Sequence, residues 1–110
     1  MNVTIEASGN LVVAYLIGEI DHHTCGDVRA RIDDAIILKK PNQLIIDFKN
    51  VSFMDSSGIG LVMGRYRLMK SIDPSSGIVV KNVSTQTKKI MELAGLGRIS
   101  TIKENTNEKA

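Results

Sequence analysis

The stretch Val-Ser-Phe-Met-Asp-Ser-Ser-Gly-Ile-Gly-Leu-Val-Met-Gly, residues 51–64, decides the fold because it joins a predicted buried strand to a predicted helix. Before it, residues 44–48 form a nearly continuous apolar run, which is typical of a strand whose two faces are both covered by helices. After it, apolar residues recur at steps of three and four, which is typical of a helix that buries one side. These residues are Ile59, Met63, Tyr66 and Met69.

Two serines stand between the predicted strand and the predicted helix. A serine hydroxyl is favoured at a helix N-cap because it accepts a hydrogen bond from an unpaired amide of the first turn. We therefore expect the helix to begin at Ser56 or Ser57 and to run to about Ile72. A helix N-terminus also offers free amides and a partial positive charge, so a phosphate on Ser56 would be accommodated locally. A capping role alone for both serines is the alternative.

The N-terminal third of the chain reads as a hairpin and a helix. Residues 2–7 alternate between apolar and polar, residues 8–10 form a turn, and residues 11–17 are apolar on both faces, so the second strand is expected to be interior. Asp21 or Thr24 can cap the following helix. Its expected buried stripe consists of Val28, Ile32, Ala35 and Ile36.

The C-terminal third adds a strand and a helix. We expect a strand at residues 78–80, a helix capped by Ser84, a left-handed residue at Gly95 and a weak edge strand within residues 98–102. The expected apolar stripe of this helix is Ile90, Leu93 and Ala94.

The predicted fold class is α/β. It is a small, mixed, mostly parallel β-sheet of four to five strands with helices, in the order ββαβαβα(β). Residues 1–103 are expected to form the domain, and residues 104–110, which carry no large apolar side chain, a flexible C-terminal tail.

Two polar loops are expected to meet at one edge of this sheet. The carboxyl ends of parallel strands joined by right-handed crossovers share an edge. The loop with Asp21, His22 and His23 should therefore lie beside Asp55 and Ser56, with the segment before Ser84 close by.

Composition excludes several classes of function. The 110 residues suit one domain, and 14 Lys and Arg against 12 Asp and Glu leave a net charge of +2, so direct nucleic-acid binding is not expected. Residues 11–17 are the longest apolar run, far short of the ~20 residues that cross a bilayer. The N-terminus lacks a charged and apolar leader. We expect a cytoplasmic protein with no membrane contact, no cofactor and no disulfide at its single cysteine, Cys25.

Two segments resemble one known family. Residues 53–60 with residues 61–66 resemble the phosphorylation segment of STAS-domain anti-sigma-factor antagonists, and residues 19–24 resemble the corresponding loop of the sporulation members. The resemblance implies a STAS fold without enzymatic activity, in which Ser56 is phosphorylated. The residues that it implies in partner binding are Glu19, Asp21, His22, His23, Asp55, Ser56, Ser57, Gly58, Ile59, Gly60 and Gly64.

The resemblance also implies partners. The unphosphorylated form would bind a SpoIIAB-like anti-sigma factor that is also a serine kinase, and would thereby release a sporulation sigma factor. The kinase would use ATP and magnesium to phosphorylate Ser56, and a SpoIIE-like, metal-dependent serine phosphatase would reverse the modification. A stress-response antagonist with a different kinase is the alternative within the family.

Three other classes of site are alternatives. A metal site at Asp21, His22 and His23 would need further ligands, yet these are the only two histidines. A small serine hydrolase or phosphoesterase could use Ser56, a histidine and an aspartate, but Met54 stands where a Gly-x-Ser-x-Gly elbow has its first glycine. Direct nucleotide binding lacks a glycine-rich phosphate loop.

Glycines and basic residues on the predicted helices leave open choices. Gly60 and Gly64 lie one turn apart, and each costs on the order of 1 kcal/mol relative to alanine. They either allow close packing on the sheet or form a bare strip that a partner backbone approaches. The basic residues are expected on solvated faces, with the first two able to contribute to the interface rim: Arg65, Arg67, Lys70, Lys88 and Lys89.

Overall fold

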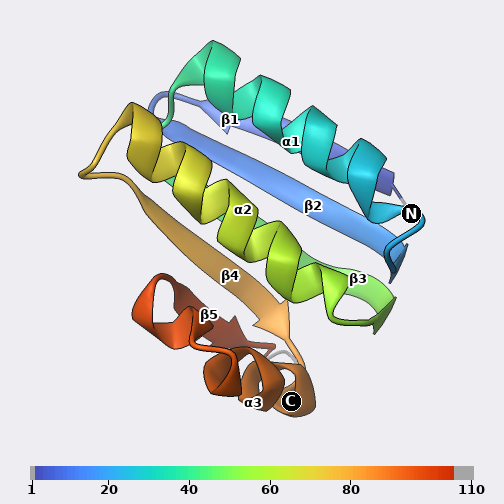
Figure 1. The fold of residues 1–110 in the computed structure, drawn as a ribbon. Coiled ribbons are helices and arrows are strands. Elements are labelled where there is room, and N and C mark those ends of the chain that lie inside the picture. Colours follow the sequence, from blue (N-terminus) through green and yellow to red (C-terminus); the bar gives the residue numbers. More distant parts are fainter. Residues whose placement is uncertain (1, 106–110) are drawn as a thin grey trace.

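The computed structural model describes residues 2–105 and confirms the predicted order of elements (Figure 1). It contains five strands, three α-helices and one 3₁₀ turn. In chain order they are β1 (Asn2–Ser8), β2 (Leu11–Ile20), α1 (Cys25–Lys39), β3 (Gln43–Met54), α2 (Ser57–Ile72), β4 (Gly77–Val83), α3 (Thr85–Leu93), the 3₁₀ turn η1 (Leu96–Arg98) and β5 (Thr101–Glu104).

The strands form one mixed, mostly parallel sheet in the order β1-β2-β3-β4-β5. β1 pairs with β2 as the expected antiparallel hairpin, and each later strand pairs in parallel with its neighbour. The hairpin turn contains Gly9 at a φ of +59°, a left-handed conformation that glycine adopts without strain. Because β2, β3 and β4 are parallel, their carboxyl ends lie at one edge of the sheet.

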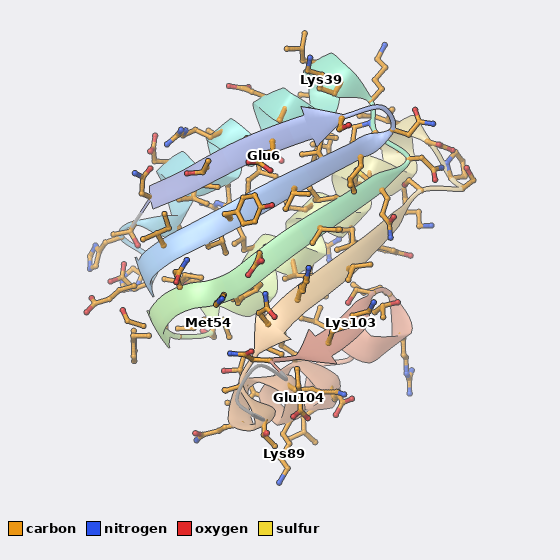
Figure 2. The ribbon with its side chains drawn as sticks, turned by 180° about the vertical axis from the view of Figure 1, so that it is seen from behind. Glu6, Lys39, Met54, Lys89, Lys103 and Glu104 are labelled. Carbon is orange, nitrogen blue, oxygen red and sulfur yellow. The ribbon has the colours of Figure 1, made fainter. Side chains whose placement is uncertain are left out.

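Helices α1 and α2 lie side by side over one face of the sheet (Figure 1). Seen from behind, the opposite face carries no helix across its centre (Figure 2). The prediction that helices cover both faces of the strand at residues 44–48 is therefore wrong. Val13, Ile45 and Val79 are neighbours in register on this open face and are half-buried, because apolar side chains on adjacent strands shield one another.

The core lies between the sheet and the two helices. Leu44 and Ile46 of β3 are fully buried there, as are the α1 residues Ile32 and Ile36. Full burial of such a side chain stabilises the fold by about 1.5 to 3 kcal/mol. The predicted stripe of α1 is confirmed, with Ala35 half-buried at its margin.

An ion pair joins the two helices. The Nε atom of Arg65 on α2 lies 2.6 Å from Oδ1 of Asp33 on α1. Arg65 is only 7% exposed, so the expectation that it lies on a solvated face is wrong. The guanidinium also donates to the carbonyl of Leu61, one turn earlier on α2. Burial lowers the pKa of Arg65, and the neighbouring carboxylate opposes that effect.

The third helix packs at the β4–β5 side of the sheet (Figure 1). Ser84 caps it as expected, since its hydroxyl accepts a 3.0 Å hydrogen bond from the amide of Thr87. The predicted apolar stripe is wrong, because Ile90 is 46% and Leu93 89% exposed while Met91 is fully buried. This helix has nine residues, of which only Met91 is buried. Gly95 has the expected left-handed conformation, with a φ of +89°.

The last described residues extend the sheet. The expected short edge strand is present as β5, but it lies at Thr101–Glu104 and not within residues 98–102, so Glu104 of the expected tail is part of the sheet. The amide of Asn105 donates to the carbonyl of Val83. Residues 106–110 of the expected tail lie outside the described residues. Within residues 2–105, the helices are too short or too polar for any of them to cross a bilayer.

Candidate functional site

The structure brings the two polar loops together at one edge of the sheet. We call this site the loop edge and define it as residues 19–24 and 54–58. The amide of Asp55 donates to the carbonyl of Ile20 at 3.0 Å, and Nδ1 of His22 lies 4.0 Å from a carboxylate oxygen of Asp55. The thiol of Cys25 points at the carbonyl of Ser57, 3.8 Å away. The geometric expectation that these loops are neighbours is confirmed.

Asp21 organises the first loop. Its Oδ1 atom accepts hydrogen bonds from the amide of His23 at 2.9 Å and from the amide and hydroxyl of Thr24 at 3.0 and 3.1 Å. The Thr24 hydroxyl also approaches the carbonyl of Glu19 at 3.3 Å. The Thr24 amide is the main cause of a lowered pKa at Asp21, so this carboxylate is ionised at neutral pH. The side chain of Asp21 therefore holds together the loop before α1 by hydrogen bonds, and α1 itself begins at Cys25.

Asp55 organises the second loop. Its Oδ1 atom accepts a 2.8 Å hydrogen bond from the amide of Ser57, which is the first residue of α2. That amide, followed by the Ser57 hydroxyl, lowers the pKa of Asp55. The N-cap residue Ser56 makes no capping bond with its hydroxyl, so the prediction of a serine cap is wrong. This role of Asp55 was not predicted from the sequence, although an aspartate whose side chain accepts from the amide two residues later is a known turn and capping pattern.

The amides of the first turn of α2 are already engaged. Gly58 donates to the carbonyl of Asp55 at 3.1 Å, and Ile59 and Gly60 donate to the carbonyl of Ser56 at 3.1 and 3.3 Å. These amides, which were expected to be free, are therefore already hydrogen-bonded, and the accommodation of a phosphate on Ser56 at this helix end stays a prediction. A phosphoryl group on the exposed Ser56 would lie next to the carboxylate of Asp55.

Accessibility differs between the two serines. Ser56 is exposed, whereas Ser57 is half-buried. Among the described residues, the Ser56 hydroxyl has no hydrogen bond to a histidine, and His22 faces Asp55 instead. The two histidine rings of the loop contact each other at a tilt of 37°, with centroids 4.1 Å apart. The nucleophile-to-base contact that a serine hydrolase uses is thus not formed.

The glycines of α2 fall into two groups. A Cβ atom at Gly58 would collide with the side chain of Met54, so this glycine serves close packing. At Gly60 and Gly64 an added Cβ would meet nothing within 4 Å. Packing on the sheet therefore does not require these two glycines, and they leave a bare strip on α2 next to Ser56.

The loop edge is acidic. Glu19 is exposed, and the carboxylates of Asp21 and Asp55 both have lowered pKa values. Such a surface complements a basic partner. Within residues 2–105, no three His, Cys, Asp or Glu side chains gather closely enough to hold a metal ion.

Comparison with known proteins gives consistent matches. The model of the STAS domain family matches residues 2–109. An anti-sigma F factor antagonist of Paenibacillus polymyxa is 34% identical over 107 residues, which are 96% of this chain and 90% of that protein. A protein of the same name from Lysinibacillus sphaericus is 38% identical over 86 residues, or 78% of this chain and 72% of that protein.

Solved structures of SpoIIAA are also similar. The anti-sigma factor antagonist SpoIIAA in its unphosphorylated form matches with a TM-score of 0.77 and 34% identity, over 92% of this chain and 87% of that chain. The Bacillus cell fate determinant SpoIIAA in the phosphorylated form matches with a TM-score of 0.71 and 34% identity, over 92% and 90% of the two chains. The resemblance to the sporulation members that the two sequence segments suggested is thereby confirmed.

Proposed function

This chain belongs to the STAS domain family and is an anti-sigma-factor antagonist, and from that premise we propose that phosphorylation of Ser56 controls its binding to an anti-sigma factor. The unphosphorylated form binds a SpoIIAB-like anti-sigma factor that is also a serine kinase. Binding releases a sporulation sigma factor for transcription. The relatives are named as regulatory antagonists, and this chain likewise acts by binding and not by catalysis.

The observation that carries this proposal is the position of the Ser56 hydroxyl. It is exposed at the start of α2 and makes no capping bond, because Asp55 performs that task. A kinase can therefore reach the hydroxyl, and its phosphorylation breaks no bond that holds the helix. This explains why a switch at Ser56 need not unfold the loop edge.

The effect of the phosphate is electrostatic and steric. It adds a charge of about −1.5 to −2 and three acceptor oxygens. Asp55 and Asp21 already make this surface negative, and the engaged amides of α2 leave the phosphate little local compensation. If repulsion, desolvation and steric exclusion together weaken binding by roughly 3 kcal/mol, affinity falls by about two decades. That difference is sufficient for a switch.

Reversal requires a second partner. A SpoIIE-like, metal-dependent serine phosphatase removes the phosphate, and the exposure of Ser56 gives it access. The whole cycle takes place in the cytoplasm, where sigma factors and ATP are available. We assign the partner contacts to residues of the loop edge, to Ile59 and to the bare strip of α2 at Gly60 and Gly64. The loop-edge residues are Glu19, Asp21, His22, His23, Asp55, Ser56, Ser57 and Gly58.

The test is phosphorylation by candidate kinases. The full-length chain is incubated with ATP, magnesium and either a SpoIIAB-like anti-sigma factor or a stress-response anti-sigma kinase, and the modified residue is mapped by mass spectrometry. Phosphate at Ser56 from the first kinase supports the sporulation role. Preferential modification by the second kinase supports the stress-response alternative. Phosphate at Ser57, or on neither serine, contradicts the proposal.

A further inference from the structure

A hollow lies beside the loop edge, at the carboxyl ends of β3 and β4 and the start of α3. Its volume is about 300 Å³. We call it the Phe53 hollow. It is lined by residues from these three elements and from the chain after β5: Phe48, Lys49, Val51, Ser52, Phe53, Met54, Asn82, Val83, Ser84, Thr87 and Asn105.

The Phe53 hollow is continuous with the loop edge. Phe53 precedes Asp55 by two residues and lies opposite Glu19 in the register of β2 and β3. Met54, labelled at the end of β3 in Figure 2, lines the hollow and also packs against Gly58. A protein that covers the first turn of α2 therefore lies next to Met54, which also lines the hollow.

The hollow combines an apolar wall with one positively charged side chain. Phe48 and Val83 are almost fully buried, at 4% and 2% exposure, whereas the Phe53 side chain is 54% exposed. A large exposed aromatic residue beside a pocket is a frequent anchor of protein interfaces. Lys49 is the one charged residue in the lining. The carboxylate of Glu104 accepts a 2.9 Å hydrogen bond from the hydroxyl of Thr85 at the start of α3 and offsets the partial positive charge of that helix end.

We propose that the Phe53 hollow is a second docking point for the anti-sigma factor and receives one of its apolar side chains with a carboxylate beside it. The apolar side chain packs on Phe53, and the carboxylate pairs with Lys49. This proposal rests on the proposed function, because it names a further contact for the same partner. Since the loop edge is negative and Lys49 in the hollow is positive, two contacts of opposite sign fix the orientation of the partner.

The test measures the dissociation constant of the SpoIIAB-like anti-sigma factor for variants of the full-length chain. Phe53→Ala removes the aromatic anchor, Lys49→Glu reverses the charge, and Ser52→Trp fills the hollow. Each should raise the dissociation constant about tenfold or more, as loss of an interface anchor does. Leu93→Ala and Lys103→Glu are matched controls at exposed positions outside the hollow, and should change it less than twofold.

Two readouts separate this proposal from the proposed function. Wild-type binding that is abolished by Ser56→Asp confirms that the assay reports the switch. Under that condition, unchanged affinity of Phe53→Ala and Ser52→Trp overturns the second docking point alone. If Ser52→Trp instead abolishes self-association of the free chain in analytical ultracentrifugation and leaves partner affinity intact, the occupant is a second copy and the proposal is wrong. If the wild type does not bind, the proposed function itself fails.

Discussion

The carboxylate of Asp55 accepts a 2.8 Å hydrogen bond from the amide of Ser57, and this bond, not a serine hydroxyl, secures the start of α2. The two residues therefore have separate roles. Asp55 caps the helix through the amide of Ser57, and the hydroxyl of Ser56, which lies between Asp55 and Ser57 in the chain, makes no capping bond. A residue that the fold does not need is available for modification.

Substitutions at Ser56 test the switch directly. Ser56→Ala should bind the anti-sigma factor as the wild type does and should stay bound in the presence of ATP, because it cannot be phosphorylated. Ser56→Asp should fail to bind at concentrations that saturate the wild type, since it adds a permanent charge beside Asp55. Isothermal titration calorimetry measures both. Ser57→Ala is the control and should still be phosphorylated at Ser56.

Asp55 should contribute to stability in a pH-dependent way. Its pKa in the folded state is lowered from 3.8, mainly by the Ser57 amide, so the unfolded chain binds more protons in acid. The contribution is present above pH 3.8 and is lost as pH falls through the lower folded value. In Asp55→Asn, urea unfolding midpoints should fall less than in the wild type between pH 5 and pH 2.5. Asp21 and Asp73 also have lowered pKa values, so the stability of Asp55→Asn should still fall somewhat as the pH is lowered.

Substitutions at Gly60 distinguish an effect on stability from an effect on docking of the anti-sigma factor. Gly60→Ala places a Cβ atom in open space and should raise the free energy of unfolding by up to about 1 kcal/mol, because alanine favours the helix. Gly60→Leu should also fold, yet it should lose affinity for the anti-sigma factor because the side chain blocks the bare strip. Thermal denaturation and calorimetry report the two effects. An unstable Gly60→Leu would instead favour a packing role.

The ion pair between Asp33 and Arg65 should matter for stability. Asp33→Ala leaves the buried guanidinium without its carboxylate and should lower the free energy of unfolding by about 3 kcal/mol, the lower end for a broken buried pair. The lower end applies because the Asp33 side chain is 30% exposed. Asp34→Ala, at the exposed neighbouring position, is the control. Equal losses in the two variants by urea denaturation would contradict the role of the pair.

Sequence patterns predicted the order of the strands and helices well, because the spacing of apolar residues differs between the two kinds of element and changes from one segment of this chain to the next. The hairpin, the stripe of α1 and the meeting of the Asp21 and Asp55 loops all follow from local periodicity and from the parallel topology. Arg65 shows the limit of such reasoning. Its burial depends on Asp33 in another helix, and no local pattern encodes that pairing.

Two further errors have physical causes. α3 is short and contacts the core through Met91 alone. Its other large apolar residues, Ile90 and Leu93, are exposed, so the three-to-four-residue spacing of apolar residues does not identify its buried side. The continuous apolar run of β3 suggested helices on both faces, but Val13 and Val79 shield Ile45 from either side on the open face. Shielding by neighbouring strands and coverage by a helix both favour apolar residues, so the sequence of one strand does not distinguish between them.

The burial of Cys25 has a practical consequence. The thiol is 3% exposed, and burial raises its pKa, so it reacts slowly with maleimides at neutral pH. A cysteine introduced at an exposed site on the open sheet face, such as Thr4, can then carry a fluorescent dye without removal of the native residue. Real-time fluorescence measurements of complex formation become possible with a probe attached outside both loops.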